Sequence, residues 1–157
     1  MRPLDRTDYA ILRALQKNAR LSNKELAALA GIAPSTCFER LRRLTDEGVL
    51  TGYHADVSPR AVGIGLQALV AVRLQQHDRL AVEAFQAHAL ALAEVVQVFH
   101  TTGRTDFLVH VAVRDAEHLR DLTLEAFTER PEVAQIETSL LFEHQVADGL
   151  PIFLGAR

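Results

Sequence analysis

Residues 22–47 constrain the fold most, because their spacing predicts a helix, a sharp turn and a second helix. Ser22 and Glu25 stand three residues apart, as in a capping box that satisfies free N–H groups at a helix start. Gly31 permits a left-handed backbone, and therefore a sharp turn after the first helix. Pro34 suits the first turn of the next helix, where its missing N–H costs nothing. The segment is therefore predicted to form a helix-turn-helix.

The remainder of residues 1–57 predicts a small domain around this unit. Asp5 is placed to cap an earlier helix. The buried stripe of that helix is Ile11, Leu12 and Leu15. Gly48 ends the third helix, and residues 49–57 predict a short β-ribbon. Three helices followed by a ribbon are typical of a winged helix-turn-helix.

From residue 66 onward the pattern changes to strands that alternate with helices. Predicted strands cover residues 66–74, 95–102, 107–113 and 133–146, and predicted helices cover 78–92 and 115–130. This β-α-β-β-α-β order predicts a ferredoxin-like domain over residues 66–146, and the fold class is α+β. Residues 58–65, with their proline and two glycines, predict a hinge. Residues 147–157 form a tail with no predicted role.

The two middle strands predict which surfaces are buried. One face is expected to carry Phe99, Phe107, Val109 and Val111, and the other Val98, His100, Leu108 and His110. The two helices can cover only one face, so the other, which is half apolar, is left open to water in a monomer. Exposed apolar surfaces of this kind mark binding sites for partners. We therefore expect a homodimer that forms through this sheet.

Charge is distributed unevenly along the chain. Residues 1–60 carry ten Lys and Arg against seven Asp and Glu, whereas residues 61–157 carry seven against thirteen. A basic N-terminal part on an acidic C-terminal part indicates that the first part binds a polyanion. No apolar run approaches the roughly 20 residues that span a bilayer, and the N-terminus shows no secretory signal. We therefore expect a cytoplasmic protein without a membrane partner.

The third predicted helix, residues 34–46, carries the side chains expected to bind double-stranded DNA. Its apolar arc is Cys37, Phe38, Leu41 and Leu44. In a helix-turn-helix the second helix enters the major groove, and its first residues meet base edges. The residues expected to meet bases are Ser35, Thr36, Glu39 and Arg40, and those expected to bind phosphates are Arg42 and Arg43. The alternative is a solvated charged face on a packing helix.

A polar turn, Gly103-Arg104-Thr105-Asp106, separates two apolar strands. Asp106 could bind the ammonium group of a ligand, and Arg104 or a backbone N–H could bind its carboxylate. The alternative is a plain hairpin turn.

The cysteine and the histidines favour packing over redox or metal chemistry. Cys37 is the only cysteine, and its place in the apolar arc favours a buried, inert thiol over a redox sensor. The seven histidines do not gather at metal-ligand spacing. His100 and His110 are therefore expected to be interface or packing residues, and neither a metal nor a cofactor is expected.

Several motifs accompany this order of elements. They are Leu4-Asp5-x-x-Asp8-x-x-Ile11-Leu12-x-x-Leu15-Gln16, Arg20-Leu21-Ser22-Asn23-x-Glu25-Leu26-Ala27, Cys37-x-Glu39-Arg40-Leu41-Arg42-Arg43-Leu44-x-x-x-Gly48-Val49-Leu50-x-Gly52-Tyr53, Thr102-Gly103-Arg104-Thr105-Asp106-Phe107-Leu108 and Ile136-Glu137-Thr138. With this ordered set, the chain resembles the Lrp/AsnC family, the feast/famine regulators of bacteria and archaea, over about residues 4–146.

The resemblance implies that the helix at 34–46 is the recognition helix and that the C-terminal domain binds an amino acid and oligomerises. The implied effector-binding residues are Thr102, Gly103, Arg104, Thr105, Asp106 and Thr138. It also implies dimers that assemble further, commonly four in a ring. Two positions differ from the family pattern: Ala33 replaces a frequent capping serine, and Arg104 stands where many relatives carry an acidic or aromatic residue.

The expected function is that of a sequence-specific transcription regulator whose DNA binding or assembly responds to a small ligand. The alternative is an architectural DNA-binding protein with low sequence specificity and no effector. An enzyme is not expected, because the sequence shows neither a nucleophile–base constellation nor a cofactor loop.

Overall fold

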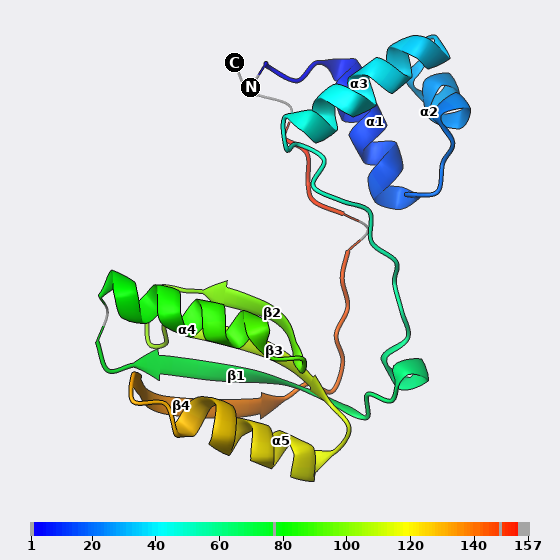
Figure 1. The fold of residues 1–157 in the computed structure, drawn as a ribbon. Helices are drawn as coiled ribbons and strands as arrows, with labels where there is room; N and C mark the ends of the chain where they lie inside the picture. The colour runs from blue at the N-terminus through cyan, green and yellow to red at the C-terminus, as the bar shows by residue number, and fades with distance from the viewer. Residues whose placement is uncertain (1, 77, 148, 154–157) are drawn as a thin grey trace. The chain divides into compact units, whose positions relative to one another are not determined.

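The computed structural model describes residues 2–76, 78–147 and 149–153, and it divides the chain into two compact units (Figure 1). The first comprises Met1–Asp56 with Gln145–Arg157, and the second Val57–His144. Of the tail at 147–157, residues 148 and 154–157 lie outside the described residues. Among the helices described, none is long and apolar enough to cross a membrane.

The first unit contains α1 (Arg6–Lys17), α2 (Asn23–Ala30) and α3 (Pro34–Asp46). Both predicted N-caps are confirmed, because Asp5 and Ser22 each accept hydrogen bonds from the first turn within a capping box. Gly31 ends α2 in the left-handed conformation, with φ +66°. The helices enclose a core of Ile11, Leu15, Leu26, Ala27, Cys37 and Leu44.

Residues 49–57 contain no strand, so the predicted β-ribbon is wrong. Instead, the N–H groups of Val49 and Leu50 both donate to the carbonyl of Leu44 near the end of α3. Their side chains pack against the helical core. These local bonds take the place of the cross-strand bonds that a ribbon needs.

The second unit contains β1 (Leu66–Leu74), α4 (Arg79–Ala91), β2 (Val95–His100), β3 (Phe107–Val113), α5 (Ala116–Thr123) and β4 (Val133–Leu140). The predicted β-α-β-β-α-β order is confirmed, and the strands form one antiparallel sheet in the order β2-β3-β1-β4. A π-helical turn, Leu124–Thr128, extends α5. The last strand is shorter than the predicted 133–146, because it ends at Leu140.

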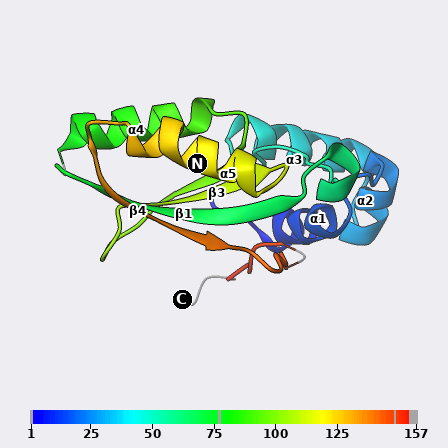
Figure 2. The same ribbon diagram turned by 90° about the horizontal axis from the view of Figure 1, so that it is seen from below.

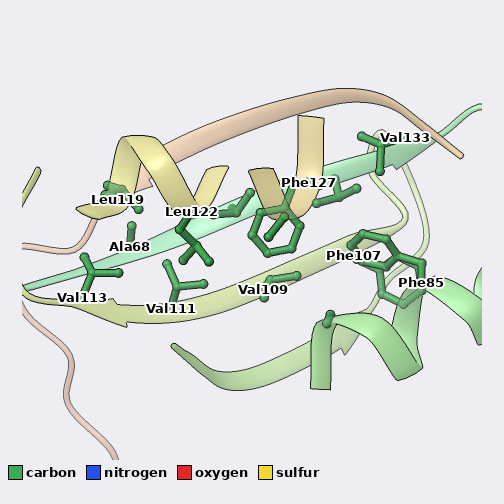
Figure 3. Close-up of a cluster of buried hydrophobic side chains, with 14 of the residues drawn as sticks. Ala68, Phe85, Phe107, Val109, Val111, Val113, Leu119, Leu122, Phe127 and Val133 are labelled. Carbon is green, nitrogen blue, oxygen red and sulfur yellow. The ribbon is translucent and has the colours of Figure 1, made fainter. Parts of the chain in front are cut away.

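Helices α4 and α5 lie on the same face of the sheet (Figure 2), which we call the covered face. Its buried side chains are Ala68, Val70, Val72 and Leu74 on β1, and Phe107, Val109, Val111 and Val113 on β3. Phe85 of α4 lies beside Phe107 (Figure 3), with the ring centroids 4.7 Å apart. Its centroid also lies 6.2 Å from that of Phe127, in the π-helical turn. This aromatic cluster links the sheet to both helical segments.

The opposite, open face carries every second residue of the same strands. The pairing of β2 with β3 differs by one residue from the prediction, because Phe99 pairs with Leu108 and His100 with Phe107. Since paired residues share a face, Phe99 lies on the open face, where it is 46% exposed. Val98 and His100 lie on the covered face, and the His100 ring stacks on Phe107 at 4.8 Å. The predicted faces of all three β2 residues are therefore wrong.

His110 is the buried polar residue of the open face. Its Nε2 donates to Oε1 of Gln67 at 2.8 Å, and its ring meets that of His144 edge-on at 5.0 Å. Burial, and to a smaller extent His144, lowers the pKa of His110. The imidazole is therefore neutral near pH 7 and acts as a packing residue.

The described part of the C-terminal tail packs on α1. The N–H of Leu150 donates to Oε1 of Gln16, and Gly149 adopts φ +135°. A Cβ at Gly149 would lie 2.9 Å from Cβ of Gln16, so this close approach requires glycine. Leu150, Pro151 and Ile152 also line a pocket of about 660 Å³ together with residues of α1 and of the segment after α3. The tail therefore completes the helical unit.

Candidate nucleic-acid interface and ligand pocket

The exposed side of α3 carries four of the six residues assigned to DNA. They are Ser35, Thr36, Glu39 and Arg42. The helix begins at Pro34, and Ala33 before it makes no side-chain capping bond. The positive end of the helix dipole therefore lies next to Ser35 and Thr36, where it favours a phosphate.

The apolar arc of α3 is narrower than its sequence predicts. Cys37 and Leu44 are fully buried, but Phe38 is 61% exposed. Burial raises the pKa of the Cys37 thiol, which keeps it protonated and unreactive. Among the residues that the structure describes, no three His, Cys, Asp or Glu side chains are grouped to hold a metal ion.

Arg40 and Arg43 are bound by two carboxylates at the start of α1. Nη1 of Arg40 donates to Oδ2 of Asp5 and to Oδ1 of Asp8, both at 2.7 Å. Nη2 of Arg43 donates to Oδ2 of Asp8, also at 2.7 Å. The Asp8 side chain is 1% exposed, and those of the two arginines are 24% and 21% exposed. Charged hydrogen bonds therefore tie α3 to α1.

The pKa of Asp8 results from opposing effects. Burial raises it, but hydrogen bonds from Arg43, from the backbone N–H of Asp5 and from Arg40 together hold the pKa below its ordinary value. The pKa of Asp5 is also lowered, with the bond from Arg40 as the largest cause. Both carboxylates are therefore ionised at neutral pH, so the two arginines keep their partners.

This cluster argues against a base contact for Arg40 and a phosphate contact for Arg43. A helical wheel of α3 places Arg43 opposite the apolar arc. Because the wheel describes one helix alone, it does not include the carboxylates at the start of α1. A signal for the cluster exists in α1, where Asp8 shares the spacing of the buried Ile11 and Leu15. A carboxylate on a buried face requires a cationic or hydrogen-bonding partner.

A shallow hollow of about 250 Å³ lies beside the exposed face of α3. It is lined by Arg2, Thr36, Glu39, Arg40 and Arg43. Arg2 is exposed and comes from the segment before α1. It adds a cation to this face that the sequence motifs did not single out.

The turn between β2 and β3 forms one wall of a second pocket, which we call the turn pocket. Its volume is about 270 Å³. It is lined by Ala71, Arg73, Gly103, Arg104, Thr105, Gln135, Ile136 and Glu137. Three of the six residues expected to bind an effector therefore meet here, and Arg73 and Glu137 are functional candidates that sequence reasoning missed. The register brings them together, because Arg73 pairs with Gln135 and Ala71 with Glu137.

The other three expected effector residues have different positions. Oδ2 of Asp106 accepts the N–H of Leu74 at 2.8 Å, and the N–H of Asp106 donates to the carbonyl of Val72 at 2.9 Å. Asp106 therefore anchors the turn to β1. Thr102 is exposed and does not line the turn pocket, and Thr138 pairs with Val70 and so lies on the other side of β4 from Glu137.

The two parts of the chain match two families of domains. Residues 4–51 match winged helix-turn-helix DNA-binding domains, and residues 67–150 match the Lrp/AsnC ligand binding domain. The chain is 46% identical over 143 residues to the HTH-type transcriptional regulator AldR of Mycolicibacterium smegmatis, with 91% of this chain and 84% of that protein covered. It is 33% identical over 140 residues to the leucine-responsive regulatory protein of Escherichia coli, with 89% and 85% covered.

Solved structures share this architecture. A transcriptional regulator of Neisseria meningitidis, determined as its complex with L-Met, matches with a TM-score of 0.86 at 33% identity and covers 95% of this chain and 97% of its own. The AsnC protein of E. coli matches with a TM-score of 0.80 at 26% identity, with 93% and 97% covered. The relatives are regulators and not enzymes. The chain therefore belongs to the Lrp/AsnC family of DNA-binding transcription regulators, with a helix-turn-helix domain and a ligand-binding domain.

Proposed function

We propose that this regulator recognises a specific DNA sequence through the exposed face of α3. One observation carries the proposal: the six residues of α3 that are assigned to DNA divide into an exposed set and a set bound to α1. The exposed set is Ser35, Thr36, Glu39 and Arg42. Hydroxyl and carboxylate groups can bond to base edges, and Arg42 is suited to a phosphate. Arg40 and Arg43 hold the helix against α1.

Binding to the DNA upstream of the protein's own gene, compared with a scrambled duplex at the same salt, tests this proposal. We expect the wild type to prefer the upstream DNA by at least about 10³-fold. Arg42→Ala should weaken binding to both duplexes alike and reduce the salt slope by about 1, because it removes one phosphate contact. Glu39→Ala should instead change the preference between them.

Arg79→Ala is the matched control for Arg42→Ala. Both arginines are exposed on a helix and form i, i+4 pairs, Arg42 with Asp46 and Arg79 with Glu83. The control should bind both duplexes like the wild type. Equal binding of the wild type to both duplexes would contradict specific recognition and favour the architectural alternative.

The second part of the proposal is an effector, an amino acid bound in the turn pocket. The pocket has a suitable size, and Arg104 and Glu137 offer partners for a carboxylate and an ammonium group. The matching Lrp/AsnC ligand binding domain and the relative solved with L-Met support this class of ligand. Residues Gly103 and Thr105 would supply backbone contacts from the turn.

The third part of the proposal is that two copies of the chain form a homodimer through the open face. Four such dimers would then assemble into a larger oligomer. The open face carries Leu69, Ala71, Phe99 and Leu108, of which the first, second and fourth are half-buried and Phe99 is exposed. Within the second unit, the described helices α4 and α5 lie on the covered face and leave these side chains uncovered. Removing them from water would stabilise association by about 25 cal/mol for each Å² of apolar area.

Replacing Leu108 by arginine tests this interface. The charge lies in the middle of the open face and cannot be buried there without a partner, so self-association should weaken by at least about 100-fold while the fold is kept. Sedimentation at several concentrations measures the change. Leu80→Arg, at a 79% exposed position of α4, is the control and should sediment like the wild type. Unchanged association of the Leu108→Arg variant would place the interface elsewhere.

A further inference from the structure

We infer that the effector in the turn pocket is an acidic amino acid, aspartate or glutamate. The inference rests on the proposed effector site, and it is carried by the charges, polarity and size of that pocket. Arg73 of β1, Arg104 of the turn and Glu137 of β4 line it. Their formal charges sum to one net positive charge at neutral pH. The nearby Asp106 carboxylate is engaged by the N–H of Leu74 at the foot of the turn.

The positions of these three groups suit an amino acid with a second carboxylate. Arg73 pairs with Gln135 and Ala71 pairs with Glu137, so Arg73 and Glu137 are diagonal neighbours on one face of the sheet. Arg104 approaches the same pocket from the turn. Glu137 can accept bonds from the α-ammonium group, one guanidinium can bind the α-carboxylate, and the other can bind the side-chain carboxylate, each in a forked geometry.

Charge matching distinguishes acidic from neutral amino acids. A neutral amino acid is a zwitterion with no net charge, so its binding would leave one of the two arginines partly desolvated without an anion. Aspartate and glutamate carry one net negative charge, which matches the net charge of the pocket. An unpaired charge at a binding site disfavours the wrong ligand, and this adds to the bonds that favour the right one.

The lining also disfavours large apolar side chains. Ala71 and Ile136 are the apolar residues among the eight that line the pocket, and the others are glycine, threonine, glutamine or charged. A leucine or methionine side chain would therefore bury little apolar area there, which removes the main source of its affinity. The volume of about 270 Å³ is enough for a single amino acid.

Calorimetric titration of the full-length protein with five separate ligands tests the inference. The ligands are L-aspartate, L-glutamate, L-alanine, L-leucine and succinate. We expect one acidic amino acid to bind at least about 10-fold more tightly than alanine and leucine. Arg104→Gln and Arg73→Gln should each remove most of that preference. Glu137→Gln should weaken the amino acids but not succinate, which has no ammonium group.

The control variant is Arg79→Gln, which removes an exposed arginine of the same domain outside the pocket and should leave all affinities unchanged. Tighter binding of alanine or leucine that depends on Glu137 would overturn the acidic effector and keep the proposed effector site. Binding of no amino acid at all, with DNA binding intact, would overturn the effector site itself.

Discussion

Replacing Asp8 by asparagine is expected to lower the free energy of unfolding of the helical unit by about 2 kcal/mol. The buried carboxylate accepts bonds from both Arg40 and Arg43, and asparagine would leave Arg43 without its carboxylate partner and Arg40 with Asp5 alone. Removing one partner of a fully buried ion pair costs more, about 3–5 kcal/mol. Here both arginines keep about a fifth of their side-chain surface in water, so hydration recovers part of the loss.

The same variant should also weaken DNA binding, because α3 would lose its charged connection to α1. Urea unfolding measures the stability, and titration of the upstream and scrambled duplexes measures the affinity. Asp46→Asn is the matched control on α3, since Asp46 pairs with Arg42 in an exposed i, i+4 pair. Exposed pairs contribute less than about 1 kcal/mol, so the control should remain near the wild type. Equal stabilities of the two variants would contradict the anchoring role of Asp8.

The pH dependence of the free energy of unfolding tests the role of this cluster independently. Because the pKa of Asp8 is lower in the folded state than in the unfolded chain, its contribution is fully present above the ordinary carboxyl pKa of about 4. The contribution is lost as the pH falls through the lower, folded-state pKa. The wild type should therefore lose stability in this acidic range more steeply than Asp8→Asn, in which this titration is absent.

The elements that the sequence predicts well are those whose signals are local. Asp5, Ser22 and Gly31 act within one helical turn, so their roles follow from spacing alone. The alternation of apolar residues likewise predicts the strands and the order of the ferredoxin-like domain. The register of β2 is not local: it depends on a loop closed by the bond from Thr101 N–H to the Asp106 carbonyl and on an irregularity between Val95 and Gln97. One residue of slip moves every side chain of the strand to the other face.

The candidate sites also contain some residues whose positions follow from local patterns and others whose positions depend on long-range contacts. The exposure of Thr36 and Glu39 follows from the helical period of α3. The partners of Arg40 and Asp106 lie 32 to 35 residues away along the chain. The buried-face position of Asp8 indicates that it needs a partner, but no local pattern identifies which residue that is. Glu137 enters the turn pocket only because β4 pairs with β1 in one particular register. Long-range pairing therefore decides which polar side chains are free to bind a ligand and which support the fold.

Phe107→Ala is expected to have the largest effect on the ligand-binding domain, a loss of about 4 kcal/mol in its free energy of unfolding. The Phe107 side chain is fully buried, and its ring contacts those of Phe85 and His100 at 4.7 and 4.8 Å. Alanine would leave a cavity at the center of the aromatic cluster that links the sheet to α4. Stability of a small domain is typically about 5–15 kcal/mol, so the loss is a large share of the total.

The position of Phe107 also connects the core to the turn pocket. It directly follows Asp106, which ties the turn to β1 through Leu74 and Val72. Loss of the aromatic anchor should therefore release the turn and weaken effector binding, while the three-helix unit keeps its fold. Urea unfolding followed by circular dichroism measures the stability, and calorimetry with the effector measures the affinity. Leu80→Ala, at a 79% exposed site on α4, should change the stability by no more than about 0.5 kcal/mol. If Phe107→Ala were as stable as this control, the aromatic cluster would not make the expected contribution to the stability of the domain.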